Sequence, residues 1–230
     1  PDPQVLVARK AKTLPVEVIV RGYITGSLWR EYEQGINGQH GFLLPEGLKK
    51  DQKFDTPILT PSTKAEYGMH DEPIARKDII SGLVDEEIYA QAEVYALKLF
   101  AAGQEWASKQ GLILVDTKYE FGMVDDELIV IDEIHTPDSS RYWIASEYEK
   151  RFNERKNQNM LDKENIRQWL IERGFSGDGT PPALTDEIRV TLAERYIELY
   201  TQLTGNEFHP LLGDVKSRIE RNLEKAGIYA

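Results

Sequence analysis

LILVDTKYEF at residues 112–121 and LIVIDE at residues 128–133 are the stretches that decide the fold of this chain. Both are short, apolar and rich in β-branched or aromatic residues, which is typical of buried strands. The segment between them, residues 122–127, is short and contains Gly and two Asp residues, a composition that favours a turn. We therefore predict a β-hairpin in which the second strand folds back along the first.

A row of charges runs along the first of these strands. Because the side chains of a strand alternate between its faces, Asp116, Lys118 and Glu120 are predicted to share one face. Three uncharged side chains are predicted on the other face: Ile113, Val115 and Thr117. The hairpin would bring Asp132 or Glu133 close to Glu120.

Charges on a buried strand need partners, because an isolated buried charge is costly. Two carboxylates beside one lysine suit Mg²⁺ and a phosphate oxygen, so the hairpin predicts a metal and phosphate site. The alternative is a solvated hairpin face with cross-strand ion pairs, and the pattern alone does not decide between the two.

Composition limits the classes of function. The 230 residues include 40% hydrophobic residues, enough for a sizeable core. The net charge of -11 argues against nucleic-acid or anionic-membrane binding as the main role, so no such partner is expected. The chain has no cysteine, which excludes disulfides and thiolate chemistry, and no signal-like or membrane-spanning apolar run. We expect a cytoplasmic protein, and the opening PDPQ without Met predicts a processed, trimmed or incompletely represented chain.

Further elements follow from the hydrophobic pattern. Residues 16–24 are predicted to form a strand that leads through Thr25, Gly26 and Ser27 into a helix at 28–34, and residues 35–71 a long ordered loop with short strands. Further helices are predicted at residues 85–110, 162–173, 185–203 and 214–226, each with a Gly at or just after its end. We expect Tyr95 and Trp106 in the core. The glycine-rich segment 174–182 lacks the order of a phosphate-binding loop, which favours a connector.

Four long blocks carry a resemblance to a known family. They are VEVIVRGYITGSLWREY from residue 16, ILTPSTKAEYGMHDEPI from residue 58, LILVDTKYEFG from residue 112 and IVIDEIHTPDSSRYW from residue 129. In these blocks the chain resembles the SAICAR synthetases, the phosphoribosylaminoimidazole-succinocarboxamide synthases, in their longer, yeast-like form. The resemblance implies an α+β fold, with a mixed or antiparallel sheet, packed helices and a kinase-like or ATP-grasp-like nucleotide cleft between two lobes.

The same resemblance divides the chain into two parts. Residues 1–15 would be the end of an N-terminal nucleotide-binding lobe and its linking strand, and residues 16–230 a C-terminal α+β lobe for substrate and metal with a helical tail. Members of the family begin with a further lysine-bearing strand region that covers the nucleotide phosphates. The expectation is that this chain lacks that segment.

The activity implied is that of an ATP-dependent ligase of de novo purine biosynthesis. ATP would activate the carboxylate of carboxyaminoimidazole ribonucleotide, and L-aspartate would then form the amide, with Mg²⁺ as cofactor. Small molecules are the expected partners, and a monomer is expected rather than an oligomer. Two alternatives remain: a kinase-like phosphotransferase with another small substrate, and a ribonucleotide-binding fragment without turnover.

The resemblance also implies roles at the catalytic end of the site. Glu120 and Asp132 would hold Mg²⁺ and the ATP phosphates, while Lys64 would reach the nucleotide. Lys118 would steady the transferred phosphate or the substrate carboxylate, and Asp116 would orient Lys118 or touch the imidazole amine. A plain salt bridge between Lys118 and Asp116 is the alternative.

Other residues match the substrate-binding positions of the family. Arg21, Ser27 and Arg141 would receive the ribonucleotide 5′-phosphate, since guanidinium and hydroxyl groups complement its oxygens. A pairing of Arg21 with Glu17 is the alternative. Asp138 would bind the ribose or amine side of the substrate. Two acids, Asp71 and Glu72, would lie near its carboxylate and the metal, and His135 is expected to be structural. No residue is assigned to aspartate.

Overall fold

The computed structural model of the chain describes residues 2–64, 71–175, 177 and 179–228. Its centre is a six-stranded sheet in which every described strand pair is antiparallel. The strands are β1 (Lys12–Tyr23), β2 (Lys53–Leu59), β3 (Ser62–Thr63), β4 (Leu112–Val124), β5 (Glu127–Ile131) and β6 (Ser140–Ile144). The main order is β2-β1-β4-β5, with β3 paired to β1 and β6 paired to β4.

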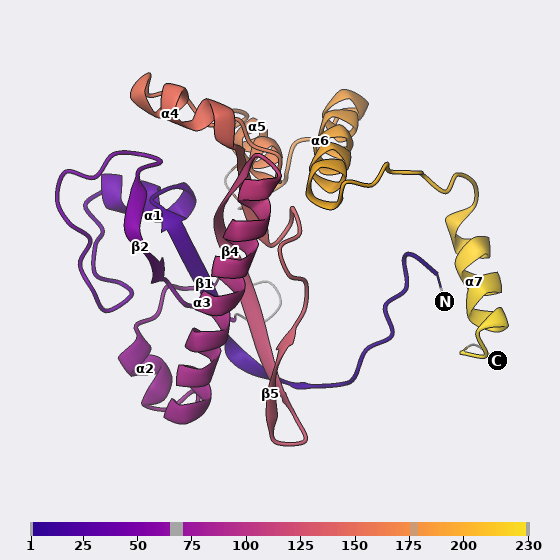
Figure 1. Cartoon of the computed structure of the whole chain (residues 1–230), viewed down its shortest axis with the longest axis horizontal. Helices are drawn as coiled ribbons and strands as arrows, with labels where there is room; N and C mark the ends of the chain where they lie inside the picture. The colour runs from indigo at the N-terminus through magenta and orange to yellow at the C-terminus, as the bar shows by residue number, and fades with distance from the viewer. Residues whose placement is uncertain (1, 65–70, 176, 178, 229–230) are drawn as a thin grey trace.

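Helices surround this sheet, and the last of them lies apart from it beside the N-terminal segment (Figure 1). They are α1 (Gly26–Glu33), α2 (Arg76–Ile80), α3 (Glu86–Lys109), α4 (Ala145–Asn153), α5 (Glu164–Ile171), α6 (Asp186–Thr204) and α7 (Val215–Lys225). An antiparallel sheet with packed helices is the predicted α+β fold, which is therefore confirmed.

Helix α3 covers one face of the sheet. Its N-cap Asp85 accepts hydrogen bonds from the backbone N–H groups of Glu87 and Ile88, which fixes the start of the helix. Buried side chains of α3 pack with β1 and β4 in one hydrophobic cluster: Ala92, Ala96 and Phe100 from the helix, Val18 and Val20 from β1, and Tyr119 and Phe121 from β4. The core therefore lies between α3 and the two central strands.

The opposite face of β1 is polar. Val16, Val18 and Val20 belong to the core, whereas the alternating residues Glu17 and Arg21 line a cavity. This alternation is what a strand with one buried and one functional face requires.

The prediction of which β4 side chains share one face of the sheet is wrong at one point, because β4 contains a β-bulge. The register of β4 with β6 shifts between Leu114 and Asp116. As a result Ile113 and Val115 pack in a second cluster with Tyr23 and Trp143, while Leu112 and Leu114 belong to the cluster under α3. An extra residue in one strand reverses the side-chain alternation beyond it, so a strict period of two was wrong at this point.

The predicted hairpin is confirmed, but its turn is tighter than expected. Strand β4 runs on to Val124 and β5 starts at Glu127, leaving Asp125 and Asp126 as a two-residue turn. Both have positive φ values, of 50° and 64°, the conformation of a type I′ turn whose twist matches the strands.

The predicted helices and loop are found with small shifts, and three short elements were missed. Of the predicted loop, residues 35–64 hold β2 and β3, while residues 65–70 lie outside the described residues. The missed elements are α2, β6 and α4.

The prediction that Trp106 lies in the core is wrong. Trp106 is 54% exposed and donates its indole N–H to the Leu203 carbonyl of α6 at 2.8 Å. Tyr95 packs against the core as expected.

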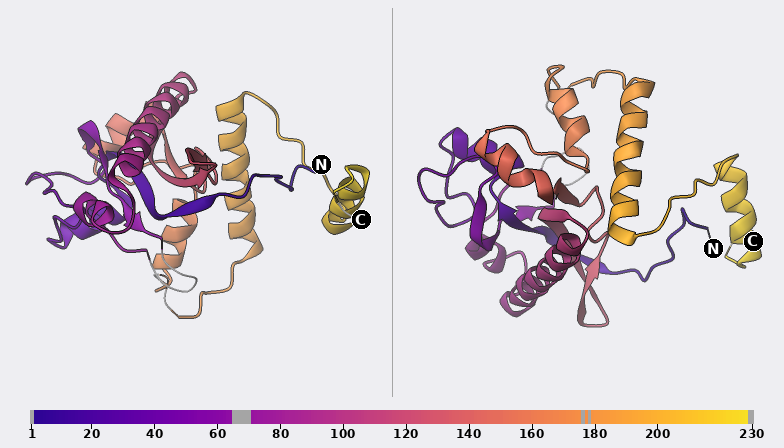
Figure 2. Two further views of the ribbon diagram at one scale, coloured as in Figure 1. Left: turned by 90° about the horizontal axis from the view of Figure 1, so that it is seen from below. Right: turned by 45° about the horizontal axis from the view of Figure 1, so that its top comes forward.

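The two ends of the chain lie side by side, away from the sheet (Figure 2). Asp2 accepts hydrogen bonds from Arg218 at 3.2 Å and Asn222 at 2.7 Å, both on α7. Across the described residues, no helix has both the length and the apolar character needed to cross a bilayer.

Candidate active site

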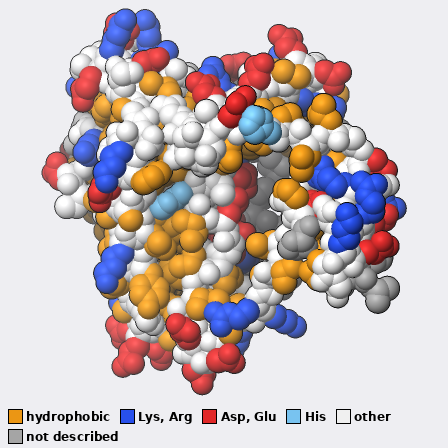
Figure 3. All heavy atoms as spheres, turned by 45° about the vertical axis from the view of Figure 1, so that its right-hand side comes forward, with side chains coloured by type: hydrophobic (Ala, Val, Ile, Leu, Met, Phe, Trp, Pro, Cys, Tyr) orange, Lys and Arg blue, Asp and Glu red, His pale blue; other side chains and the backbone are white. Residues whose placement is uncertain are grey.

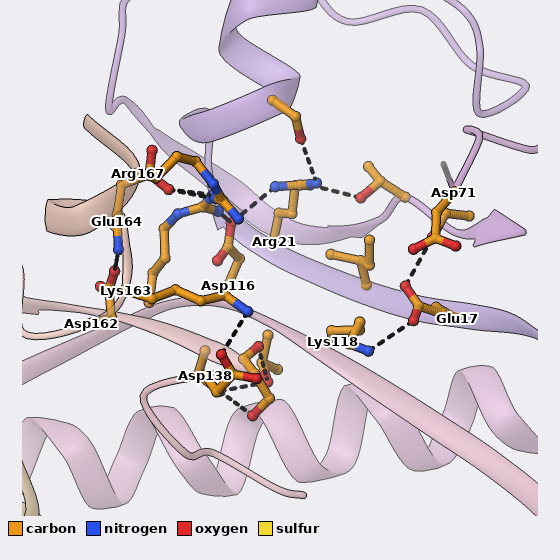
Figure 4. A pocket seen from close by; sticks show the side chains of 18 of the residues that line it. Glu17, Arg21, Asp71, Asp116, Lys118, Asp138, Asp162, Lys163, Glu164 and Arg167 are labelled. Carbon is orange, nitrogen blue, oxygen red and sulfur yellow. Dashed lines mark hydrogen bonds and ion pairs between the residues drawn. The ribbon is translucent and has the colours of Figure 1, made fainter. Parts of the chain in front are cut away.

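A cavity of about 850 Å³ lies on the face of the sheet opposite α3. Residues of β1, α1, β4, β6 and α5 line it, so distant parts of the chain meet there. Figure 4 shows Arg167 and Glu164 at one end, Arg21 and Asp116 in the middle, and Lys118 at the other end. The space-filling view in Figure 3 shows a hollow in one face, with charges of both signs scattered around it.

The register of β1 and β4 brings the charged rows of the two strands together. Glu17 lies opposite Glu120, and Arg21 lies opposite Asp116. Directly opposite residues of antiparallel strands point to the same face, so both pairs are presented to one side of the sheet. The predicted shared face of Asp116, Lys118 and Glu120 is part of this arrangement.

The first cluster is built around Asp116. Its Oδ2 accepts hydrogen bonds from Nη1 of Arg21 at 2.9 Å and from Nη1 of Arg141 at 2.5 Å. Arg21 also donates from Nη2 to the Ser27 hydroxyl at 3.3 Å and from Nε to Thr60 at 2.8 Å. Three of the predicted phosphate-binding groups, Arg21, Ser27 and Arg141, are thus brought together.

Burial and charge act against each other at these two arginines. Their side chains are 7% and 15% exposed. Burial lowers the pKa of Arg21, with Asp116 opposing it. At Arg141 burial also acts to lower the pKa, but the carboxylates of Asp116 and Glu164 outweigh it and the pKa is raised. Both guanidinium groups stay charged, as an anion-binding site needs.

The second cluster surrounds Lys118. Its Nζ lies 2.8 Å from Oε1 of Glu17 and 2.7 Å from Oε1 of Glu120, and Glu120 also pairs with Lys64. Burial raises the pKa of Glu17, and the nearby charge of Lys118 lowers it by less. Burial works against the charge of Lys118, yet its two carboxylate partners raise its pKa. For Glu120, Lys118 and Lys64 outweigh burial, so its pKa is lowered.

These contacts correct two predicted relationships. Lys118 pairs with Glu17 and Glu120, so Asp116 does not orient it and the alternative salt bridge between Lys118 and Asp116 is wrong. Asp116 instead holds the two arginines. The alternative of an Arg21–Glu17 pair is wrong as well. The cross-strand ion pairs were predicted within the hairpin, whereas the Glu17–Lys118 pair joins β4 to β1 and faces the cavity.

The metal prediction rests on Glu120 and Asp132. Ile131, the last residue of β5, lies opposite Glu120, and Asp132 follows with a φ of 64° that takes the chain out of the strand. Among the residues that the structure describes, no group of three or more His, Asp and Glu side chains is arranged to hold a metal. Mg²⁺ commonly uses one or two carboxylates together with substrate phosphates, so the donor set fits that ion and the site stays a prediction.

Of the remaining predicted residues, Asp71 and Asp138 line the cavity, whereas Glu72 and His135 do not. Asp71 lines the cavity, and its charge contributes to the raised pKa of Glu17. Asp138 also lines the cavity, and its Oδ1 accepts a hydrogen bond from Nζ of Lys163 at 2.9 Å. Glu72 is exposed, and its backbone carbonyl accepts the N–H of Thr63. His135 is structural as expected, because its Nε2 lies 2.6 Å from the Tyr119 hydroxyl, outside the cavity lining.

A third cluster, on and before α5, was missed by the sequence analysis. Glu164 is buried and accepts from Arg141 Nη2 at 3.2 Å and Arg167 Nη1 at 2.7 Å. Asp162 accepts the backbone N–H groups of Tyr142 at 2.9 Å and Glu164 at 2.8 Å, tying α5 to β6. The sequence predicts a helix here but assigns it no site residue. Its signal was the dense run of charges DKENIR at residues 162–167.

Comparison with known proteins adds independent evidence. Residues 1–182 match the model of the SAICAR synthetase family. The phosphoribosylaminoimidazole-succinocarboxamide synthase of Bacteroides fragilis is 48% identical over 97% of this chain and 72% of its own length. The enzyme of Cytophaga hutchinsonii is 49% identical over 98% of this chain and 74% of its own.

Solved structures agree with this relationship. The SAICAR synthase of Saccharomyces cerevisiae, solved as a complex with SAICAR, has a TM-score of 0.70 at 39% identity. The match covers 87% of this chain and 64% of the yeast chain. A SAICAR synthetase in complex with ADP has a TM-score of 0.60 at 27% identity, over 87% of this chain and 67% of that one. The chain thus spans about two thirds to three quarters of its relatives and, on its matched family model, its high identity and its shared fold, belongs to the SAICAR synthetase family.

Proposed function

We propose that the whole protein joins L-aspartate to the carboxylate of carboxyaminoimidazole ribonucleotide, with ATP converted to ADP and phosphate. The observation that carries this proposal is one cavity that holds two separate groups of cations, with Arg21 and Arg141 in one group and Lys118 in the other. A ribonucleotide with a 5′-phosphate and a distant carboxylate has matching anionic ends. The SAICAR and ADP complexes of the two solved relatives support the same pair of ligands.

The 5′-phosphate is proposed to bind at Arg21, Ser27 and Arg141. Two guanidinium groups and a hydroxyl supply directional donors for its oxygens. Asp116 already holds both arginines at 2.9 and 2.5 Å, so they need little reorganisation when the phosphate binds. This preorganisation is the proposed role of Asp116.

The reaction is proposed to proceed in two steps. A carboxylate oxygen of the ribonucleotide attacks the γ-phosphorus of ATP, and ADP leaves with the electrons of the broken P–O bond. The amine nitrogen of aspartate then attacks the acyl carbon, and phosphate leaves as the C–N bond forms and the nitrogen loses its proton. Both steps build negative charge that fixed cations stabilise.

Lys118 is proposed to act as such a fixed cation. Its pKa is raised by Glu17 and Glu120, so it stays protonated and cannot serve as a base near neutral pH. Glu120 and Asp132 would hold Mg²⁺, which neutralises phosphate charge when bound.

The arrangement of the chain is part of the proposal. Residues 1–15 are proposed to link a nucleotide-binding lobe to the described lobe, a role supported by the exposed, irregular course of residues 6–10 ahead of β1, which begins at Lys12 (Figure 1). Lys64 is proposed to reach the nucleotide from beside Glu120. The proposed state is a cytoplasmic monomer, and light scattering of the purified protein at working concentration tests its mass.

Product analysis tests the function. With ATP, Mg²⁺ and the ribonucleotide labelled with ¹⁸O in its carboxylate, ADP and labelled phosphate should form with the succinocarboxamide only when aspartate is present. Release of unlabelled phosphate alongside that product would contradict the acyl phosphate. Accumulation of a phosphorylated small molecule without aspartate would indicate a phosphotransferase instead, and binding of the ribonucleotide with no turnover would indicate a binding protein.

A further inference from the structure

We propose that a second cavity, on the α3 side of the sheet, binds a small flat aromatic molecule with an uncharged amide-like edge, and that this ligand strengthens ribonucleotide binding in the first cavity. The second cavity has a volume of about 320 Å³ and is lined by residues of β2, α2 and α3 and of the loop before β2. The proposed reaction uses none of its lining residues, so the site goes beyond the proposed function.

A buried hydroxyl without a partner points to a ligand in this cavity. Tyr89 of α3 is fully buried, and among the described residues its hydroxyl finds no hydrogen-bond partner. Buried tyrosine hydroxyls usually have one, because burial without a hydrogen bond costs free energy. Burial raises the pKa of Tyr89, the charge of Glu93 raises it further and that of Arg76 lowers it. Since Glu93 and Arg76 line the cavity as well, the hydroxyl belongs to its charged end.

The charged end of the second cavity favours an uncharged ligand. Arg76 donates from Nε to Oε2 of Glu93 at 3.0 Å, and its Nη1 lies 3.5 Å from Oε1 of Glu86. One arginine thus faces two carboxylates, which leaves no spare positive charge for an anion. The groups left for a ligand are donors on Arg76, acceptors on Glu93 and the Tyr89 hydroxyl, which can do both. A carbonyl beside an N–H, as in an amide, matches this set.

The walls of the second cavity are apolar and suit a flat ring. They are formed by Phe42, Pro57, Ile58, Pro61 and Leu97. The imidazole of His40 lies beside Phe42, with ring centroids 6.3 Å apart and planes at 30°. Burial, and after it the charge of Arg21, lowers the pKa of His40 to about 4, so this ring is uncharged near neutral pH. A volume of about 320 Å³ is at the small end for ligand cavities, which limits the occupant to one or two rings.

The segment that follows β2 separates the two cavities. Leu59 and Pro61 line the second cavity, whereas Thr60 and Ser62 line the first. Thr60 accepts a hydrogen bond from Nε of Arg21 at 2.8 Å, so this segment holds an arginine of the proposed phosphate site. A ligand packed against Leu59 and Pro61 restrains the segment and so preorganises Arg21 for the ribonucleotide. Because such coupling is reciprocal, the ribonucleotide should strengthen ligand binding by the same factor.

Titration of the whole protein with benzamide, followed by NMR, tests the site. Benzamide combines one aromatic ring with an amide and should bind with a dissociation constant of about 1 mM or lower. Benzoate has nearly the same shape but is an anion, and it should bind at least about tenfold more weakly. No binding of benzamide up to about 10 mM, or equal binding of the two compounds, would overturn the proposal.

Tyr89→Phe removes the hydroxyl and keeps the ring. It should weaken benzamide binding by about fivefold and leave the melting temperature unchanged or raised, because the free protein loses no hydrogen bond. Tyr95→Phe is the matched control, since Tyr95 lies on the same helix outside the cavity lining and its hydroxyl accepts Nε2 of Gln91 at 2.8 Å. Benzamide should bind that control as it binds the wild type. Equal affinities in the two variants, or a lower melting temperature in Tyr89→Phe, would contradict the role of the hydroxyl and overturn the site.

Leu97→Trp blocks the cavity without a change in the buried core. Leu97 is 38% exposed and lines the cavity, so a larger side chain there can fill the space from the rim. Benzamide should no longer bind detectably to this variant. Unchanged benzamide binding in Leu97→Trp would place the compound elsewhere and overturn the site.

Ribonucleotide titrations by calorimetry test the coupling. Saturating benzamide should lower the dissociation constant of the ribonucleotide by about twofold or more in the wild type and leave it unchanged in Leu97→Trp. No change in the wild type would overturn the coupling, and competition between the two ligands would overturn the site, because benzamide would then occupy the first cavity. If the ribonucleotide does not bind at all, the proposed function and the coupling fail, whereas the benzamide titrations still decide the second site.

Discussion

Arg21 and Asp116 lie directly opposite each other on β1 and β4, and their buried side chains form an ion pair of 2.9 Å. The same carboxylate binds Arg141, so one acid holds two arginines at the wall of the cavity. Because the two central strands carry the contact, the rigid core of the sheet sets its geometry. An anion that binds here meets two cations already in place.

Loss of the central acid should destabilise the protein. In Asp116→Asn the two guanidinium groups lose the charge that balances them, and unfolding free energy should fall by about 3 kcal/mol. Inorganic phosphate should restore part of this loss, because it can bind between the arginines. Chemical denaturation with and without phosphate measures both effects. Asp55→Asn, an exposed acid on β2, is the control; equal stability of the two variants would contradict the argument.

Gly26 makes room for Arg141. A Cβ at Gly26 would lie 2.7 Å from Cζ and 2.9 Å from Nη1 of Arg141. Gly26→Ala should therefore displace the guanidinium and weaken ribonucleotide binding by about tenfold or more, measured by calorimetry. Gly35→Ala is a matched control, since both glycines have positive φ, 60° and 78°, but nothing lies within 4 Å of a Cβ at Gly35. Equal losses of binding in the two variants would show that backbone strain, and not Arg141, is responsible.

Asp162 should make stability depend on pH. Burial raises the pKa of Asp162 to about 6 from a usual value of 3.8, although hydrogen bonds from the N–H groups of Glu164 and Tyr142 act to lower it. The folded state then binds a proton more tightly than the unfolded state, so this contribution is present below pH 4 and lost as pH rises to about 6. Relative to Asp162→Asn, the wild type should lose on the order of 2–3 kcal/mol across that range. Denaturant unfolding at several pH values measures this difference, and a difference independent of pH would contradict it.

Gly103 on α3 provides the space for His135. A Cβ there would lie 2.8 Å from Nε2 of His135 and 2.7 Å from Cδ2 of Leu114. His135 is held by the Tyr119 hydroxyl at 2.6 Å, so it cannot move away freely. Gly103→Ala should lower stability by about 1–3 kcal/mol although Ala favours helices. Gly82→Ala, with nothing within 4 Å of its Cβ, is the comparison, and an unchanged melting temperature in Gly103→Ala would contradict the packing argument.

Local patterns were sufficient to predict most of the fold. The alternation in β4 and the turn at Asp125 and Asp126 are local, and so is the N-cap of α3 at Asp85. The bulge after Leu114 could not be predicted, because it arises where β4 pairs with β6. Short elements such as α2 have too few residues to show a period.

The site was predictable in its residues but not in its pairings. The row Asp116, Lys118 and Glu120 could be placed on one face from the alternation alone. Which partner each charge takes depends on the register between β1 and β4, strands far apart in the sequence. The cluster at Glu164 depends on α5 folding back over β6, a tertiary contact that the charged run at residues 162–167 does not specify by itself.

The most direct test of the central claim compares two ligands on two proteins by calorimetry. The claim is that Arg21 and Arg141 receive the 5′-phosphate of the ribonucleotide. Removal of that phosphate from the ligand should weaken binding to the wild type by about a hundredfold, and by only about tenfold in Arg21→Ala, where one of its two guanidinium partners is already lost. An equal loss of affinity in the two proteins would contradict the claim, because the phosphate would then bind elsewhere.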